Sequence, residues 1–201
     1  MKKIIIRLLS TESVKESLSF VMSYIDEDRL HKAKKFKQEK DQLQSLGAAY
    51  LIKKYLPNKK IEYPLKKKPF IKDGPYFNIS HSGKYIVLAI DDEEDVGVDI
   101  ERIDEKKIEA IKFVSEERID SIDTNDIFKI WTNKESLIKC RGTGISEIRF
   151  APGLPLEGLR NFCNKEYFTK SLIYDGYSLS LTRKGNLPFE IELIPVNIEK
   201  N

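Results

Sequence analysis

The segment that most constrains the fold runs from Trp131 to Gly144, W-T-N-K-E-S-L-I-K-C-R-G-T-G, and it has the periodicity of a helix. Four residues separate Glu135 from Lys139, so in a helix both project from one face beside Trp131. A carboxylate next to an ammonium group suits a site that holds phosphate and moves protons. An ordinary surface salt bridge gives the same pattern, so this segment alone leaves both interpretations open.

A second region has the periodicity of strands. Residues 77–90, F-N-I-S-H-S-G-K-Y-I-V-L-A-I, are rich in β-branched residues and are broken by Ser82-Gly83. After an acidic turn comes V-G-V-D-I-E, in which a two-residue spacing sends Asp99 and Glu101 to one face of a strand. Converging carboxylates repel each other unless a cation neutralises them, and short oxygen ligands favour Mg²⁺. The alternative is a solvated acidic strand end.

Helix and strand patterns follow one another along the chain and suggest two similar halves. Two glycine-led strands, residues 83–88 and 176–181, are similar enough to suggest an internal duplication. The expected strands are residues 3–9, 76–80, 85–91, 96–101, 167–174, 177–182 and 190–196, and the expected helices are residues 11–24, 28–56, 106–113, 115–121 and 126–141.

Composition indicates a globular protein. With 201 residues, 40% hydrophobic and 33% charged, the chain can form one large or two small domains. No apolar run approaches the length of a membrane span, and Arg7 interrupts the short apolar run at the start. Cys140 and Cys163 have no metal-ligand spacing, and no disulfide is implied. We therefore expect a reduced, cytoplasmic protein with no membrane partner.

The charges are segregated although the net charge is only +3. Residues 1–68 hold 17 Lys/Arg against 8 Asp/Glu, whereas residues 91–126 hold 5 against 15. Such blocks are typical of solvated helix faces and turns. The functional alternative is a basic surface for a polyanion beside an acidic metal site. Nucleic acid is the usual polyanion for a basic region, but it would not explain the acidic half.

Three blocks, in this order, resemble the surfactin-type 4′-phosphopantetheinyl transferases. They are Lys68-Pro69 followed by F-N-I-S-H-S-G, then G-V-D-I-E, then W-T-N-K-E-S-L-I-K with the glycines after it. A looser match lies in residues 28–47, so the likeness spans roughly residues 24–146. Enzymes of this family move the phosphopantetheine arm of coenzyme A onto a serine of an apo acyl or peptidyl carrier protein and release 3′,5′-ADP.

The resemblance implies an α+β fold, a pseudo-twofold repeat of two similar halves, each a small antiparallel sheet packed by helices, with the active site in the cleft between them. Residues 1–93 would form the N-terminal half that binds coenzyme A, and residues 94–201 the C-terminal half with the metal ligands and catalytic helix. Because the chain carries both halves, the resemblance implies a monomer. Coenzyme A has a 3′-phosphate and a diphosphate, so it would account for both charge blocks.

The resemblance also implies roles for single residues. Asp99, Glu101 and Glu135 would bind Mg²⁺, with Mn²⁺ as the alternative. Glu135 and Lys139 would be catalytic, Glu135 accepting the proton of the carrier serine and Lys139 stabilising the departing 3′,5′-ADP. Lys134 would hold a diphosphate oxygen. The implied contacts with coenzyme A are Arg29, Lys32, Ser45, Lys68, Pro69, Ser80, His81, Lys134 and Lys139.

The chain departs from the family pattern in two places. Leu65-Lys66-Lys67 replaces the glycine expected before Lys68-Pro69, which affects the implied backbone contact with adenine. Arg118 stands where the family usually has an acid, so neither Glu116 nor Glu117 can be assigned a role.

Two other functions stay open: a basic nucleic-acid-binding module, and a carrier-binding relative that has lost catalysis. The presence of Asp99, Glu135 and Lys139 argues against the second. If carrier proteins do bind, their acidic surface requires an apolar or basic surface beside the site. We predict that Lys112 or Phe113 belongs to that surface, whereas Ile108 and Ile111 are as well explained as core residues.

Overall fold

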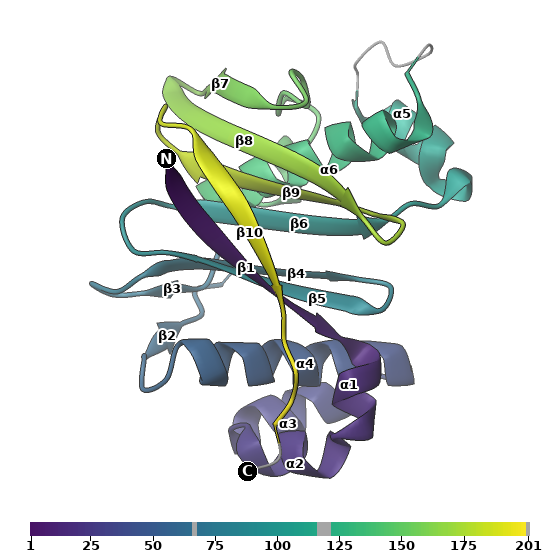
Figure 1. The fold of residues 1–201 in the computed structure, drawn as a ribbon, viewed down its shortest axis with the longest axis vertical. Helices are drawn as coiled ribbons and strands as arrows, with labels where there is room; N and C mark the ends of the chain where they lie inside the picture. The colour runs from purple at the N-terminus through teal and green to yellow at the C-terminus, as the bar shows by residue number, and fades with distance from the viewer. Residues whose placement is uncertain (66–67, 116–121, 200–201) are drawn as a thin grey trace.

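The computed structural model describes residues 1–65, 68–115 and 122–199, and it is a mixed α+β fold, as predicted (Figure 1). Two four-stranded sheets lie between two groups of helices, and a two-stranded ribbon of β2 (Ile61–Glu62) and β3 (Phe70–Ile71) stands beside them. In the described part of the chain, no helix is long and apolar enough to cross a membrane.

The first sheet has the order β10-β1-β5-β4. Its strands are β1 (Lys2–Ser10), β4 (Tyr76–Ser82), β5 (Tyr85–Asp91) and β10 (Phe189–Pro195). β10 pairs with β1 in parallel, with Phe189 opposite Lys2. The expectation of two purely antiparallel sheets is therefore wrong at this pair, and the last predicted strand joins the first sheet and not the second.

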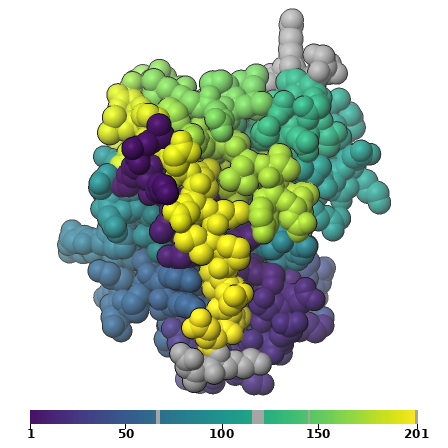
Figure 2. Space-filling view, viewed as in Figure 1, coloured from purple at the N-terminus to yellow at the C-terminus, as the bar shows by residue number. Residues whose placement is uncertain are grey.

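The C-terminal segment continues past β10 toward the helices of the first half. The Val196 amide donates to the Leu8 carbonyl at 2.8 Å, and Ile198 packs against the core beneath the sheet. Figure 2 shows this segment crossing the face of the molecule, from the sheets to the helices at the other end. Residues 196–198 thus pack against the helices and strands of the N-terminal half.

The second sheet is antiparallel throughout, with the order β6-β9-β8-β7. Its strands are β6 (Val96–Arg102), β7 (Gly158–Phe162), β8 (Lys165–Tyr174) and β9 (Tyr177–Lys184). The sequence did not predict β7, a five-residue edge strand in which only Arg160 is buried. A short edge strand has little hydrophobic alternation by which to recognise it.

Four helices lie on one side of the first sheet, where two long ones were predicted. They are α1 (Thr11–Glu16), α2 (Leu18–Tyr24), α3 (Glu27–Lys34) and α4 (Glu39–Tyr55). Of these, α1 and α4 make the main contacts with its strands. The break between α3 and α4 falls where the basic last turn of α3, with Lys32 and Lys34, meets the acidic first turn of α4, with Glu39 and Asp41. Each set of charges complements the dipole of its own helix end, so two helices are favoured over one.

The helices of the second half are η1 (Glu105–Lys107), α5 (Ile108–Ser115), α6 (Thr124–Arg141) and η2 (Ile145–Glu147). The predicted helix 115–121 lies outside the described residues except for Ser115, which ends α5. Glu116, Glu117 and Arg118 also lie outside the described residues, as do Lys66 and Lys67.

Alternation along the strands builds the core between the two sheets. Ile4, Ile6 and Leu8 of β1 belong to one buried cluster with Val98 and Ile100 of β6. The intervening residues of β6 face away from this core. The two-residue period therefore leaves the carboxylates of β6 on the opposite side of the strand, as the sequence predicts.

Candidate active site

The site lies where β4, an edge strand of the first sheet, runs beside β6, an edge strand of the second. Side chains join the two strands, because alternate residues of β4 point toward β6. Asn78 Oδ1 accepts from Val98 N at 2.9 Å, Ser80 Oγ donates to Asp99 Oδ1 at 2.9 Å, and Ser82 Oγ accepts from Arg102 N at 3.1 Å.

α6 packs directly on β6, and Gly97 makes this possible. A Cβ atom at Gly97 would lie 2.0 Å from the Ser136 carbonyl oxygen and 2.2 Å from the Cys140 amide nitrogen. Any side chain at this position would push the helix away from the strand. The glycine of G-V-D-I-E therefore sets the separation between the strand that carries Asp99 and the helix that carries Glu135.

Buried hydroxyl groups fix α6 along the same sheet. Thr132 is hydrogen-bonded to Ser180 at 2.7 Å, and Ser136 to Thr182 at 2.8 Å. All four side chains are fully buried. Buried hydroxyl groups must stay paired, so these bonds fix the register of the helix on β9.

An ion pair stands at the centre of the site. Lys139 Nζ of α6 lies 2.5 Å from Asp99 Oδ1, 3.0 Å from Ser80 Oγ and 4.0 Å from Glu135 Oε2. These residues line one cavity of about 320 Å³ together with His81, Glu101 and Trp131. The structure thus brings together both predicted catalytic residues and all three predicted metal ligands.

Burial and neighbouring charges perturb these groups. Burial, followed by the nearby Asp99 carboxylate, raises the pKa of Glu135 to about 7. Burial would lower the pKa of Lys139, but Asp99 and Glu135 outweigh it and raise that pKa, so Lys139 stays an ammonium ion. A carboxyl group with a pKa near neutrality can accept a proton and release it under physiological conditions.

The three carboxylates suit a hard divalent cation by their chemistry, because all are oxygen donors in one cavity and their mutual repulsion adds to the raised pKa of Glu135. Residues 1–65, 68–115 and 122–199 nevertheless contain no group of three or more His, Cys, Asp or Glu side chains close enough to hold a metal ion. Lys139 lies against Asp99, and Lys107 pairs with Glu101. The two ammonium groups supply the compensating charge in this structure, and the metal site stays a prediction.

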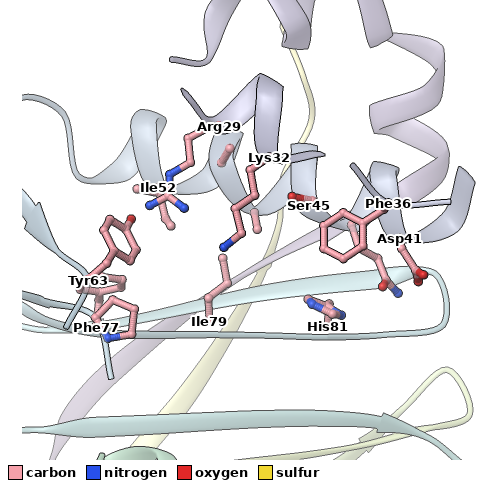
Figure 3. Close-up of a pocket in the computed structure, with 14 residues that line it drawn as sticks. Arg29, Lys32, Phe36, Asp41, Ser45, Ile52, Tyr63, Phe77, Ile79 and His81 are labelled. Carbon is pink, nitrogen blue, oxygen red and sulfur yellow. The ribbon is translucent and has the colours of Figure 1, made fainter. Parts of the chain in front are cut away.

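A larger, basic cavity of about 500 Å³ adjoins the first, and Ile79 and His81 line both. Arg29 and Lys32 come to it from α3, Ser45 from α4, and Pro69 from the loop before β3. In Figure 3 Arg29 lies toward one end and His81 toward the other, with Lys32 between them. Five predicted coenzyme A contacts thus line one cavity.

His81 stands at the boundary between the two cavities, with its side chain still exposed to solvent. The surrounding protein lowers the pKa of its imidazole, and the Lys139 ammonium adds to this effect. The imidazole is therefore neutral at physiological pH until an anion binds beside it.

Two predicted contacts lie elsewhere. Lys134 is 1% exposed, lines neither cavity, and donates to the Ser115 carbonyl at 2.7 Å. Lys68 Nζ donates to the Val96 carbonyl at 2.7 Å and lies 3.4 Å from Asp95 Oδ1, so it ties the loop before β3 to the start of β6. Both ammonium groups serve the protein backbone here, and their contacts with coenzyme A stay predictions.

The sequence did not predict two residues that lie beside the site. Lys107 of η1 reaches back to Glu101, and Tyr63 contributes its ring to the basic cavity. Nothing in the spacing of either residue indicates the contact, because each depends on how a loop folds back. Tyr63 could have been suspected only as an aromatic residue near a lysine-rich loop.

Fold and site together define the class of protein: an α+β protein with a carboxylate–ammonium group at the junction of two sheets and a basic cavity beside it. The model of the 4′-phosphopantetheinyl transferase superfamily matches residues 95–182, from the turn before β6 into β9. The chain is 34% identical over 143 residues to 4′-phosphopantetheinyl transferase gsp of Aneurinibacillus migulanus, a match covering 63% of this chain and 60% of the relative. It is 30% identical over 146 residues to 4′-phosphopantetheinyl transferase Sfp of Bacillus subtilis (strain 168), covering 62% and 63%.

The chain is similar to the 4′-phosphopantetheinyl transferase superfamily over residues 95–182, and this similarity confirms the resemblance found in the sequence. It matches about 60% of the length of the first of these relatives and 63% of the second.

Proposed function

We propose that this protein transfers the 4′-phosphopantetheine arm of coenzyme A to a serine of an apo acyl or peptidyl carrier protein and releases 3′,5′-ADP. One observation carries the proposal: the cavity with Glu135 and Lys139 shares the wall formed by Ile79 and His81 with the basic cavity. A substrate with a phosphorylated nucleotide at one end and a reactive diphosphate next to it fits two such adjoining cavities.

In the proposed reaction the carrier serine Oγ forms a bond to the phosphorus that carries the pantetheine arm. The bond from that phosphorus to the bridging oxygen breaks, and 3′,5′-ADP leaves with the oxygen. Glu135, with a pKa of about 7, takes the serine proton. Lys139, which also donates to Ser80, offsets the negative charge that grows on the bridging oxygen.

Asp99, Glu101 and Glu135 are the residues that would hold Mg²⁺, or Mn²⁺ in its place. A divalent ion bound there supplies further charge neutralisation to the diphosphate. Lys139 and Lys107 would then give up their present contacts with Asp99 and Glu101. Ser80 is hydrogen-bonded to the same Asp99 oxygen as Lys139, so it keeps that carboxylate oriented.

The exposed end of α5 is the proposed surface for the carrier protein. Phe113 is 75% exposed, and the Arg149 guanidinium lies 5.6 Å from its ring centroid, so an apolar group and a cation stand side by side. Such a pair suits an acidic partner with an apolar centre. Ile108 and Ile111 pack into the core against α6, which is the alternative noted for them from the sequence.

The pseudo-twofold arrangement of residues 1–93 and 94–201, with the site between the halves, is part of the same proposal. Two similar hairpins support it, β4–β5 and β8–β9, since each turns through a glycine with positive φ: 54° at Gly83 and 74° at Gly176. β10 belongs to residues 94–201 but pairs with β1 of residues 1–93, so one strand crosses the boundary between the proposed halves. We also propose that the protein works as a cytoplasmic monomer.

Mass spectrometry of an apo carrier protein incubated with coenzyme A, Mg²⁺ and this protein tests the proposal. We expect a gain of about 340 Da, the mass of the phosphopantetheine arm, and no gain with excess EDTA. A carrier whose serine is changed to alanine is the control. Absence of the gain on both acyl and peptidyl carriers would contradict the activity, and an undiminished gain in EDTA would contradict the metal requirement.

A further inference from the structure

Arg29 of α3 rests on the ring of Tyr63, with its guanidinium carbon 4.0 Å from the ring centroid. Tyr63 follows β2 in the segment between α4 and β3 and is 49% exposed. Among the described residues, the Arg29 guanidinium has no hydrogen-bond or ion-pair partner, so its N–H groups are unused. A stacked guanidinium keeps these donors in the plane of the group, free for a ligand at its edge.

The obvious carboxylate partner of Arg29 is already occupied. Asp26, which precedes α3, pairs with Lys53 of α4 at 2.8 Å. An aromatic ring therefore holds Arg29 where a carboxylate could have done so. The difference matters because a carboxylate would neutralise the cation and bond its donors, whereas a ring fixes the position and leaves charge and donors available.

The Arg29–Tyr63 pair forms part of the wall between two cavities. It lines the basic cavity of about 500 Å³ and also a second one of about 380 Å³. Figure 3 shows Arg29 and Tyr63 close together at one end of the basic cavity, near Ile52. Burial lowers the pKa of Arg29, with Asp26 and Asp28 opposing it, so the cation is partly desolvated and gains more from an anion.

We propose that Tyr63 is a positioning residue that sets selectivity for the 3′-phosphate of coenzyme A, by holding the Arg29 guanidinium at the wall of the basic cavity. The inference rests on the proposed function, since it takes coenzyme A as the ligand. Tyr63 acts through Arg29 and not by touching the reacting atoms. Its removal therefore costs affinity only for ligands that carry the 3′-phosphate.

Calorimetric titration of the 201-residue protein with coenzyme A and with 3′-dephospho-coenzyme A tests this. We expect Tyr63→Leu to weaken coenzyme A binding about fivefold and to leave 3′-dephospho-coenzyme A binding unchanged. Tyr63→Phe keeps the ring and should keep the selectivity. Tyr76→Leu is the matched control, because Tyr76 is 39% exposed on β4 and lines neither cavity. In an Arg29→Met background, Tyr63→Leu should have no further effect.

Equal weakening of both nucleotides by Tyr63→Leu would overturn the inference, because the ring would then contact the ligand itself or only support the fold. Unchanged binding of both would overturn it as well. A parent protein that binds both nucleotides equally tightly would overturn it and leave the proposed function intact. A parent that binds neither would overturn both.

Discussion

Gly97 of β6 and Ser136 of α6 approach so closely that a Cβ atom on the glycine would lie 2.0 Å from the serine carbonyl oxygen. The obstacle is backbone, which cannot turn aside like a side chain. The distance from Asp99 to Glu135 and Lys139 on the helix therefore depends on the absence of one methyl group at position 97.

Gly97→Ala should consequently reduce the transfer rate by about 100-fold, because small displacements of catalytic groups are costly. Coenzyme A affinity, which depends on the basic cavity, should change much less. Transfer rate and calorimetric affinity are the measurements. Gly176→Ala is a control for glycine replacement, since nothing lies within 4 Å of a Cβ there, although its φ of 74° brings some strain. An unimpaired Gly97→Ala enzyme would contradict the packing argument.

Lys139→Ala should cut turnover by about 100-fold or more and change coenzyme A affinity little, because its charge is needed most as the leaving group departs. Lys129→Ala serves as the control, since Lys129 is another α6 lysine, paired with Asp126 and lining neither cavity. Single-turnover rates and calorimetric titration separate the two quantities. Equal losses in both would mean that Lys139 is a binding residue.

His81→Ala should weaken coenzyme A binding by about 1–3 kcal/mol, the value of a charge-assisted contact. The pKa of His81 is lowered in the free protein and should rise beside a bound phosphate. Binding then takes up a proton, so affinity should be greater at about pH 6 than at about pH 8. His81→Ala should lose that part of the pH dependence. His31→Ala is the control, because His31 is exposed on α3, and it should keep the pH dependence. A pH dependence in the His81 variant as steep as in the parent protein, or steeper, would contradict the assignment.

The double variant Lys112→Ala/Phe113→Ala should raise the KM for the carrier protein about three- to tenfold, as for a moderate interface contact. Coenzyme A affinity should not change, since neither residue lines the two cavities. Leu187→Ala removes a comparably exposed apolar side chain from the turn between β9 and β10 and is the control. A folded double variant with an unaltered carrier KM would exclude this surface.

Asp91→Asn tests stability away from the site. Asp91 is buried and receives hydrogen bonds from Lys2 at 2.7 Å and Arg183 at 2.8 Å. Burial would raise its pKa, but these bonds and one from the Glu93 backbone hold it below the usual value.

Because the folded pKa is depressed, this stabilisation is present above the unfolded pKa of about 4 and is lost as the pH falls through the folded value. At pH 7 the variant should lose about 3 kcal/mol of unfolding free energy, as when a buried ion pair loses one partner. Urea unfolding at several pH values should show the difference shrinking below about pH 4. Asp92→Asn, at the exposed neighbouring position, should change little. If the loss of unfolding free energy in Asp91→Asn stays constant down to low pH, the negative charge of Asp91 is not its cause.

Short-range periodicity predicted the part of the site that lies within single elements. The spacing of Asp99 and Glu101 on a strand, and of Glu135 and Lys139 on a helix, was enough to put each pair on one face. The packing of α6 on β6 brings these pairs together, and no local pattern encodes that packing. It came only from the family resemblance.

The present contacts of two predicted coenzyme A ligands are long-range ones. Lys134 and Lys68 stand in family motifs, but their ammonium groups reach backbone carbonyls of Ser115 and Val96, 19 and 28 residues away. A lysine on a four-carbon stem can point to a substrate or back to its own chain, and only the tertiary fold decides between them.

The pairing of β10 with β1 has a consequence for synthesis of the protein. The ribosome makes Lys2 long before Phe189, its partner in the sheet, so one side of β1 stays open until residues 189–195 have emerged. Closing a loop of that length is slow, and an open strand edge invites wrong pairing in the meantime. A nascent fragment ending near residue 93 is therefore not a finished folding unit, and a chain cut between the halves would leave β1 without β10 until the two pieces reassociate.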